Sequence, residues 1–262
     1  MIQRKFCFVV VVGSFLSITA GVAQENFTRL LYDVASVKPS QPGAPEGEVD
    51  PLPGGIGYNA NRISIKDMLS VMYRIPGRQI VGGPEWLSNE KFDVEARADR
   101  PYSIDDLHIM FQNLLADRFN LKLHKQVRIG PVYVLTVAKP GLKMTPVDSG
   151  IDRHNPITTS GDNVTTGDRV PLNYLCFWLG QNLQNDQRPV INKTNLTGTY
   201  NFTMSFRPQL PPDASAEGIS PEIQNLPTIF EAMRAQLGLN LVPQKGPVEF
   251  LVIDHVEKPS RN

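Results

Sequence analysis

Two distant stretches of this sequence repeat one order of signals, and this repetition constrains the fold more than any other feature. Each stretch opens with a Ser or Thr that an acidic residue follows three positions later, at Ser103 and at Thr228. Such a pair caps the start of a helix, and apolar residues then recur at helical spacing. Both stretches continue through alternating apolar residues to Gly-Pro-Val, a further apolar run and Lys-Pro. The pattern predicts two related helix–strand–strand units, at 103–138 and 228–256.

The two predicted helices also end alike. One ends in the sequence FNLKL at 119–123 and the other in LGLNL at 237–241. Asn120 and Gly238 occupy equivalent positions in these segments. Asn and Gly are the residues that most readily adopt the left-handed conformation after a helix, so we expect both to have positive φ.

Two weaker units complete the pattern. One helix is predicted to start at Ser64 and another near Pro171, and comparable strands follow at Phe92 and Tyr200. A helix with two strands buries too little apolar surface to be stable alone, so the four units must pack together. The sequence therefore predicts an α+β fold of repeated helix–strand–strand units, with antiparallel or mixed sheets and with helices packed on one face.

The chain divides into four segments on this interpretation. They are a signal peptide at 1–23, an N-terminal half with two units at 24–140, a polar linker at 141–169 and a C-terminal half with two units at 170–262. The linker is assigned because the segment is polar and has no apolar periodicity.

The first residues have the features of a secretory signal. Arg4 and Lys5 precede an apolar run at 6–18, and the small residues Gly21 and Ala23 suit cleavage after Ala23. A signal anchor is the alternative, but the run is short for a membrane span. No later stretch is long and apolar enough to span a bilayer, so we expect a secreted or periplasmic protein without a membrane span.

The composition excludes several classes of protein. The 262 residues include 26 basic and 26 acidic side chains, so the formal net charge of zero argues against a nucleic-acid partner. The 2 cysteines are too few for a disulfide scaffold or a multi-cysteine zinc site. A hydrophobic fraction of 41% is enough for a folded core.

The common catalytic and cofactor motifs are missing. The sequence has no H-E-x-x-H, no G-x-S-x-G and no phosphate-binding P-loop. A Gly-Ile-Gly segment at 55–57 imitates a dinucleotide loop, but Pro51 and Pro53 stand where the preceding strand should be. We therefore expect no cofactor.

The reactive residues form no recognisable site. Cys176 lies on an apolar helical stripe, which is typical of a buried thiol and not of a nucleophile. The four histidines share no metal-binding spacing: His108, His124, His154 and His255. The linker aspartates match no EF-hand: Asp148, Asp152, Asp162 and Asp168. We predict no catalytic residue and no metal site, with a site assembled from distant residues as the alternative.

Three residues are candidates for binding. Trp86 follows a Gly-Gly-Pro-Glu turn, which either presents the ring or buries it in the core. Arg188 and Lys193 belong to a basic turn before a strand, which could bind an anion or could be a solvated turn.

Several of these segments, taken in order, resemble the "soil-associated protein" family. They are Val34–Pro39, Gly83-Pro-Glu-Trp-Leu87, Leu114–Phe119, Arg188-Pro-Val190, Lys193-Thr194, Leu196-Thr-Gly198, Tyr200, Leu237-Gly-Leu239, Lys245–Glu249 and Val252–Ser260. The resemblance covers nearly all of the chain after the signal. It implies a secreted bacterial protein of unknown function, with many copies in some soil bacteria. A related domain attached to membrane metallopeptidase-type sensors implies an extracytoplasmic sensing or binding module and assigns no catalytic residue.

The chain departs from that family at one turn. The family usually has Asp where this chain has Asn192 and Asn201, and Gly where it has Asn195. This chain lacks those two carboxylates. If the family uses them for metal binding or acid–base chemistry, that function is impaired in this chain. The units also resemble, in topology, the small periplasmic N-terminal domains of secretins and TonB-dependent receptors, which bind partner proteins.

Three hypotheses follow from the sequence. The first is an exported, non-catalytic binding, interaction or sensing module whose partner is an envelope protein or a small ligand. The second is a secreted hydrolase whose site is assembled from distant loops, and the third is a structural envelope protein. A pocket with convergent ionisable groups would favour the hydrolase. An open sheet edge or an apolar surface patch would favour partner binding.

Overall fold

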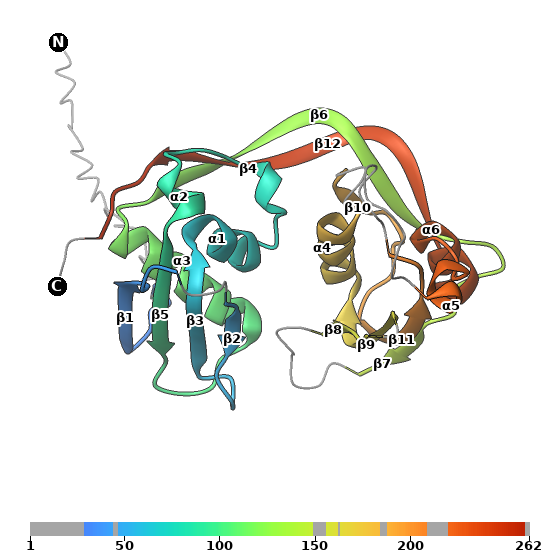
Figure 1. The fold of residues 1–262 in the computed structure, drawn as a ribbon, viewed down its shortest axis with the longest axis horizontal. Coiled ribbons are helices and arrows are strands. Elements are labelled where there is room, and N and C mark those ends of the chain that lie inside the picture. Colours follow the sequence, from blue (N-terminus) through green and yellow to red (C-terminus); the bar gives the residue numbers. More distant parts are fainter. Residues whose placement is uncertain are drawn as a thin grey trace, which may run out of the picture.

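The protein has two lobes that lie side by side, with two long strands running over both (Figure 1). The computed structural model describes residues 29–43, 47–148, 156–161, 163–183, 188–208 and 220–259. The predicted signal peptide at 1–23 lies outside these residues. Helices combined with antiparallel and mixed sheets give an α+β fold, as the sequence predicts.

The N-terminal lobe is an antiparallel sheet with helices on one face. Its strands, in order across the sheet, are β1 (Val34–Pro39), β5 (Lys91–Arg97), β3 (Gly57–Ser64) and β2 (Val49–Pro51). Its helices are α1 (Ile65–Tyr73), α2 (Trp86–Asn89) and α3 (Ile104–Arg118). Phe92, Val94 and Ala96 of β5 are buried and alternate with more exposed residues, so one face of the sheet packs against the helices.

The C-terminal lobe contains a second four-stranded antiparallel sheet. Its strands, in order, are β7 (Thr145–Val147), β11 (Thr199–Ser205), β9 (Val164–Pro171) and β8 (Ile157–Thr159). Its helices are α4 (Leu172–Asn182), α5 (Pro221–Gln224) and α6 (Ile229–Ala232), and α6 continues into a π-helical turn at Met233–Leu237. Tyr200, Phe202 and Met204 of β11 share a core with Leu175 and Leu179 of α4.

The third sheet joins the lobes. Its order is β10 (Val190–Asn192), β6 (Lys122–Val137), β12 (Leu239–His255) and β4 (Ile80–Gly82). The strands β6 and β12, here called the ribbon, pair antiparallel along their whole length, with Gly130 opposite Gly246. The short strands β10 and β4 lie parallel to β6 and β12 respectively.

The ribbon carries each half of the sequence into the core of the other half. Leu251 and Ile253 of β12 belong to the N-terminal core, although they come from the end of the chain. Leu135 of β6 belongs to the C-terminal core. Each core therefore needs a strand from the other half, and no boundary in the sequence separates the two cores.

The helix boundaries agree with the sequence prediction. The side chains of Ser64, Ser103 and Thr228 each accept a hydrogen bond from the backbone N–H three residues later. Asn120 and Gly238 have φ values of 44° and 70°, so both adopt the left-handed conformation.

The prediction of two strands after α3 and after α6 is wrong, because each helix leads into one continuous strand. The break was expected at the Gly-Pro pairs. Tyr133 donates its backbone N–H to Pro189 on the side of β6 away from β12. Residues two apart in a strand direct their backbone groups to the same side, so the nitrogen of Pro131 also faces away from β12. The missing N–H of Pro131 therefore removes no hydrogen bond between β6 and β12. A proline is tolerated at such a position.

The polar linker at 141–169 is also corrected. This segment contains β7, β8 and most of β9, which form three strands of the C-terminal sheet. The strands β7 and β8 have only three residues each and carry Thr and Pro, so they show no apolar alternation. Backbone pairing with β9 and β11 holds them in place, and a sequence pattern does not record such pairing.

The two outer sheets have corresponding strand orders. The order β1-β5-β3-β2 in one lobe matches β7-β11-β9-β8 in the other. The helix α1 follows directly after β3, and α4 follows directly after β9. In the part of the chain that the structure describes, no helix combines the length and the apolar character that crossing a membrane would require.

Candidate functional site

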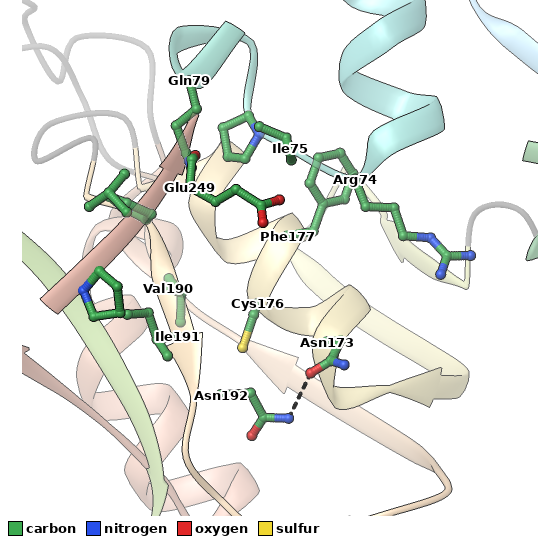
Figure 2. Close-up of a pocket in the computed structure, with 14 residues that line it drawn as sticks. Arg74, Ile75, Gln79, Asn173, Cys176, Phe177, Val190, Ile191, Asn192 and Glu249 are labelled. Carbon is green, nitrogen blue, oxygen red and sulfur yellow. Dashed lines mark hydrogen bonds between the residues drawn. The ribbon is translucent and has the colours of Figure 1, made fainter. Parts of the chain in front are cut away.

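A cavity of about 290 Å³ lies between the lobes and against the ribbon (Figure 2). We call it the inter-lobe cavity. Its residues come from the end of α1 and the turn after it, from α4, from β10 and from β12. They are Arg74, Ile75, Pro76, Gln79, Asn173, Cys176, Phe177, Pro189–Asn192 and Pro247–Glu249. A cavity with walls from both lobes is a usual place for a small ligand.

Arg74 occupies the end of α1, at one wall of the cavity. It has φ 50° and ψ 42°, and its backbone N–H donates to the carbonyls of Ser70 and Val71, which closes the helix. The guanidinium forms an ion pair with Asp105 at 2.9 Å. Its Nε is buried and has no hydrogen-bond partner. The ion pair with Asp105 orients this cation at the end of α1.

The helices α1 and α4 hold the lobes together beside the cavity. Gln181 donates from Nε2 to Ser70 Oγ at 3.2 Å, and Ser70 Oγ donates to the carbonyl of Ile75 at 2.7 Å. A Cβ at Gly180 would lie 3.2 Å from Pro76 Cγ, so only a glycine allows this close approach without a shift. These contacts set the distance between the wall formed by α1 with the turn after it and the wall formed by α4.

Gln79 ties the other side of the cavity to the ribbon. The residue is 6% exposed, and its Nε2 donates to the backbone carbonyl of Glu249 at 2.7 Å. Its Oε1 is buried without a partner. The 3₁₀ turn Gly77–Gln79 is thus fastened to β12 and leaves one acceptor unused.

Asn192 organises the turn after β10. Its Oδ1 accepts hydrogen bonds from the N–H and the hydroxyl of Thr194, and its Nδ2 donates to Asn173 Oδ1 at 2.9 Å (Figure 2). An aspartate could accept the first two bonds but could not donate the third. Asn195, at φ 58°, is in the left-handed conformation that Asn and Gly adopt most readily. In this chain the turn residues therefore stabilise local structure.

Cys176 lines the inter-lobe cavity but is not arranged as a nucleophile. The side chain is 6% exposed, and burial raises the pKa of its thiol to about 12. The neutral thiol is the form present near neutral pH, whereas the thiolate is the reactive form. None of the described residues that line the cavity with it is a histidine.

The described histidines lie apart from this cavity. His124 pairs with Asp254 at 2.8 Å across the ribbon, and His255 pairs with Glu257 at 2.8 Å. His108 is buried beside the ring of Tyr58, 5.8 Å away. His154 lies outside the described residues. Within the described ranges no three His, Cys, Asp or Glu residues cluster as metal ligands would.

The structure separates the three candidate binding residues. Trp86 packs on Phe119 and Phe92, with ring centroids at 6.3 and 6.4 Å, so the ring belongs to the N-terminal core. Lys193 is exposed and lines neither this cavity nor the one described next. Arg188 lines a second cavity.

This second cavity, of about 320 Å³, shares Gln79, Pro189 and Val248 with the first. We call it the arginine cavity, because Arg78 and Arg128 line it together with Arg188. Arg78 and Arg128 were not expected at a binding site from the sequence. They lie far apart in the sequence and meet only because the ribbon brings their segments together, so no local pattern marks them.

The fold and the two cavities just described define a class: a two-lobed α+β protein with adjacent cavities beside a shared two-stranded ribbon. The chain belongs to the family described as "Protein of unknown function (DUF3738)", whose model matches residues 66–256. No curated protein matches the sequence significantly. No solved structure matches it significantly either.

Proposed function

We propose that this protein is an exported, non-catalytic binding protein that holds a small ligand between its lobes. The observation that carries the proposal is the inter-lobe cavity, whose walls come from α1, α4, β10 and β12. A ligand that lies between the two lobes has more of its surface buried than a ligand that contacts one lobe alone. A cavity favours a small ligand over the alternative of an envelope protein as the partner.

The ionisable groups around the cavity support binding over catalysis. A nucleophile needs a base within hydrogen-bond reach and a third group that orients the base. Cys176 lines the cavity as a neutral thiol, and none of the described lining residues is a histidine. Among the described lining residues the charged ones are Arg74 and Glu249, whereas hydrolysis by carboxyl groups uses a pair of them.

Export to the periplasm or the medium is the second part of the proposal. It is supported by the signal-like residues 1–23 and by the resemblance to the "soil-associated protein" family of secreted bacterial proteins. Exported protein should begin at Gln24, and N-terminal sequencing tests this. Retention of Met1 on a membrane-bound product would contradict it.

We further infer that the two halves arose by internal duplication. The support is the corresponding strand order of the two outer sheets, the pairing of Gly130 with Gly246 and the similar ends of α3 and of the π-helical turn. The repeated unit is then larger than helix–strand–strand, since it includes the outer strands of each sheet.

The binding proposal can be tested with a cavity-blocking variant. Asn173 is exposed at the cavity wall, so Asn173→Trp should fill the space at small cost to stability. Ile109→Trp is the matched control, because Ile109 is 43% exposed on α3 and lines neither cavity. A metabolite library is screened by thermal shift, and hits are measured by calorimetry. Ligands should bind the parent and Ile109→Trp alike and fail to bind Asn173→Trp, and equal binding to all three proteins would contradict the proposal.

A further inference from the structure

Three arginines from separate parts of the chain meet at the arginine cavity. Arg78 lies in the 3₁₀ turn before β4, Arg128 lies on β6, and Arg188 lies just before β10. The remaining lining residues are Gln79, Ile129, Gly130, Pro131, Pro189, Val248 and Phe250. None of these described residues is acidic, and no described carboxylate forms a salt bridge with Arg78 or Arg128.

Arg78 is the most unusual of the three. Its Nε and Nη2 are buried and have no hydrogen-bond partner. Burial lowers the pKa of Arg78 from its usual value, which is the sign of a desolvated cation. A Cβ at Gly180 would lie 3.8 Å from Nη2, so the backbone of α4 packs close to the guanidinium. Because Nε and Nη2 are enclosed, an anion in the cavity would interact with Arg78 through the charge of its guanidinium, which a low-dielectric surrounding strengthens.

Arg128 is held in place by uncharged groups. Its guanidinium carbon lies 4.7 Å from the centroid of the Phe250 ring, and its Nε and Nη2 both donate to Gln126 Oε1, at 2.8 and 2.5 Å. These contacts orient the side chain but leave its charge uncompensated. The third side chain, Arg188, lies over the ring of Tyr133 at 5.3 Å. Pro189, next to it, accepts the backbone hydrogen bond of Tyr133 at 2.9 Å, so this segment is attached to β6.

Apart from Gln79, the other described lining residues of the arginine cavity are apolar. Ile129, Pro131 and Pro189 line it with Val248 and Phe250, and the volume of about 320 Å³ exceeds what a bare oxyanion fills. Guanidinium groups match the geometry of carboxylate and phosphate oxygens, which they bind through paired N–H donors. We propose that the arginine cavity binds a small organic anion, a carboxylate or phosphate group carried on an apolar body. This inference goes beyond the proposed function, because it assigns a ligand class to the second, adjacent cavity.

The test uses four probes with the exported full chain: benzoate, phenyl phosphate, inorganic phosphate and neutral benzyl alcohol. Calorimetry should show saturable binding of benzoate or phenyl phosphate that weakens as salt is added. Benzyl alcohol should bind at least tenfold more weakly. Inorganic phosphate should bind more weakly than phenyl phosphate, because it makes no contact with the apolar wall.

Two variants and one control assign the binding to the cavity. Arg78→Gln and Arg128→Gln should each weaken the aryl anion at least tenfold. Arg234→Gln, which removes the same charge at an exposed position outside both cavities, should leave affinity unchanged. Arg78→Gln should not lower the melting temperature of the ligand-free protein, because Arg78 has unpaired buried donors, and this separates a binding role from a structural one.

The outcomes also separate this inference from the proposed function. If no aryl anion binds, or if Arg234→Gln weakens it as much as Arg78→Gln does, the anion inference is wrong. If an uncharged compound then binds and Asn173→Trp blocks it, the proposed binding function stands without the anion. Failure of every compound to bind would reject both. Equal affinity for inorganic phosphate and phenyl phosphate would reject the apolar part of the inference.

Discussion

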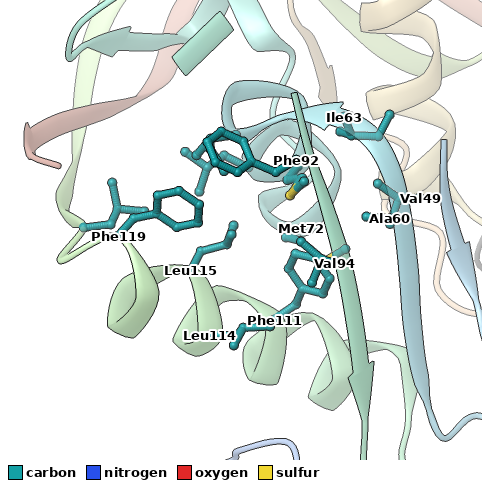
Figure 3. Packing of buried hydrophobic residues seen from close by; sticks show 14 of the residues in the cluster. Val49, Ala60, Ile63, Met72, Phe92, Val94, Phe111, Leu114, Leu115 and Phe119 are labelled. Atoms are coloured by element: carbon teal, nitrogen blue, oxygen red, sulfur yellow. The ribbon is translucent and has the colours of Figure 1, made fainter. Parts of the chain in front are cut away.

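The two lobes share a strand order but fill their cores differently. The N-terminal core contains Phe92, Phe111 and Phe119 together with Met72, and the fifteen-residue helix α3 covers it (Figure 3). At the matching place the C-terminal lobe has the four-residue α6 and a π-helical turn of five residues. The difference shows that the strand order does not depend on a long helix. The ribbon closes both cores, so a shorter helix is sufficient in one of them.

Because the ribbon closes both cores, we expect the two lobes to unfold together. The substitution with the largest expected effect removes an aromatic side chain from the N-terminal core. Phe111→Ala should lower the free energy of unfolding by about 4 kcal/mol, since Phe111 is fully buried. Each 1.4 kcal/mol changes the unfolding equilibrium constant about tenfold. If Cys176 in the other lobe is exposed by the same unfolding, its labelling rate should rise by roughly several hundredfold. Thiol labelling followed by mass spectrometry measures this. Unchanged labelling of Cys176 in a destabilised N-terminal lobe would show that the lobes unfold independently.

The next test compares the two left-handed helix ends. A Cβ at Gly238 would lie 2.0 Å from the backbone oxygen of Gly141, so Gly238→Ala adds a steric clash to the cost of a positive φ. We expect a loss of about 3 kcal/mol. Asn120→Ala should cost about 1 kcal/mol, because its backbone position already accepts a side chain. Urea unfolding of both variants measures the difference, and equal losses would contradict the comparison.

The helix starts give a smaller contrast. Thr228 and Glu231 bond reciprocally, with the backbone N–H of Thr228 donating to Glu231 Oε2 at 2.8 Å. Thr228→Ala should cost about 1.5 kcal/mol, and Ser103→Ala, at the start of the longer α3, about 1 kcal/mol. Thermal unfolding at neutral pH checks both values. A larger loss for Ser103→Ala would mean that helix length, and not the reciprocal cap, decides the cost.

The smallest effect is a pH dependence specific to the C-terminal lobe. The hydrogen bond from the backbone of Thr228, followed by that from its hydroxyl, lowers the pKa of Glu231 below its usual value. The pKa of Glu231 is lower in the folded protein than in the unfolded chain, so the ionised carboxylate stabilises the fold at pH values above the unfolded pKa. This stabilisation is lost as the pH falls through the folded-state pKa. An NMR titration of the Glu231 carboxyl should therefore show a midpoint below that of a model glutamate. Thr228→Ala removes the hydroxyl but keeps the backbone N–H, so the shift should become smaller without disappearing. A midpoint at the ordinary value in the parent protein would contradict the prediction.

Local signals in the sequence predicted the parts of the fold that depend on neighbouring residues. Capping by Ser64, Ser103 and Thr228 and the left-handed conformations of Asn120 and Gly238 follow from side chains within a few positions. The α+β class follows from the alternation of helical and extended patterns.

The rest depends on pairing between distant segments. The continuity of β6 through Pro131 is set by which edge of the strand the proline faces, and that depends on the position of β12. The strands β7 and β8 exist because β9 and β11 offer backbone partners. Of the three arginines that line the arginine cavity, the sequence pointed only to Arg188 as a binding candidate, since Arg78 and Arg128 reach the cavity through the third sheet.

The pairing of Gly130 with Gly246 has a consequence for symmetry. The residue pairs of the ribbon run outward from this point, from Lys122 opposite His255 at one end to Val137 opposite Leu239 at the other. A chain made of one half alone would leave the far part of its long strand unpaired and its core open. The long strands thus pair to similar lengths on both sides of Gly130 and Gly246, and neither half of the sequence closes a core without the other.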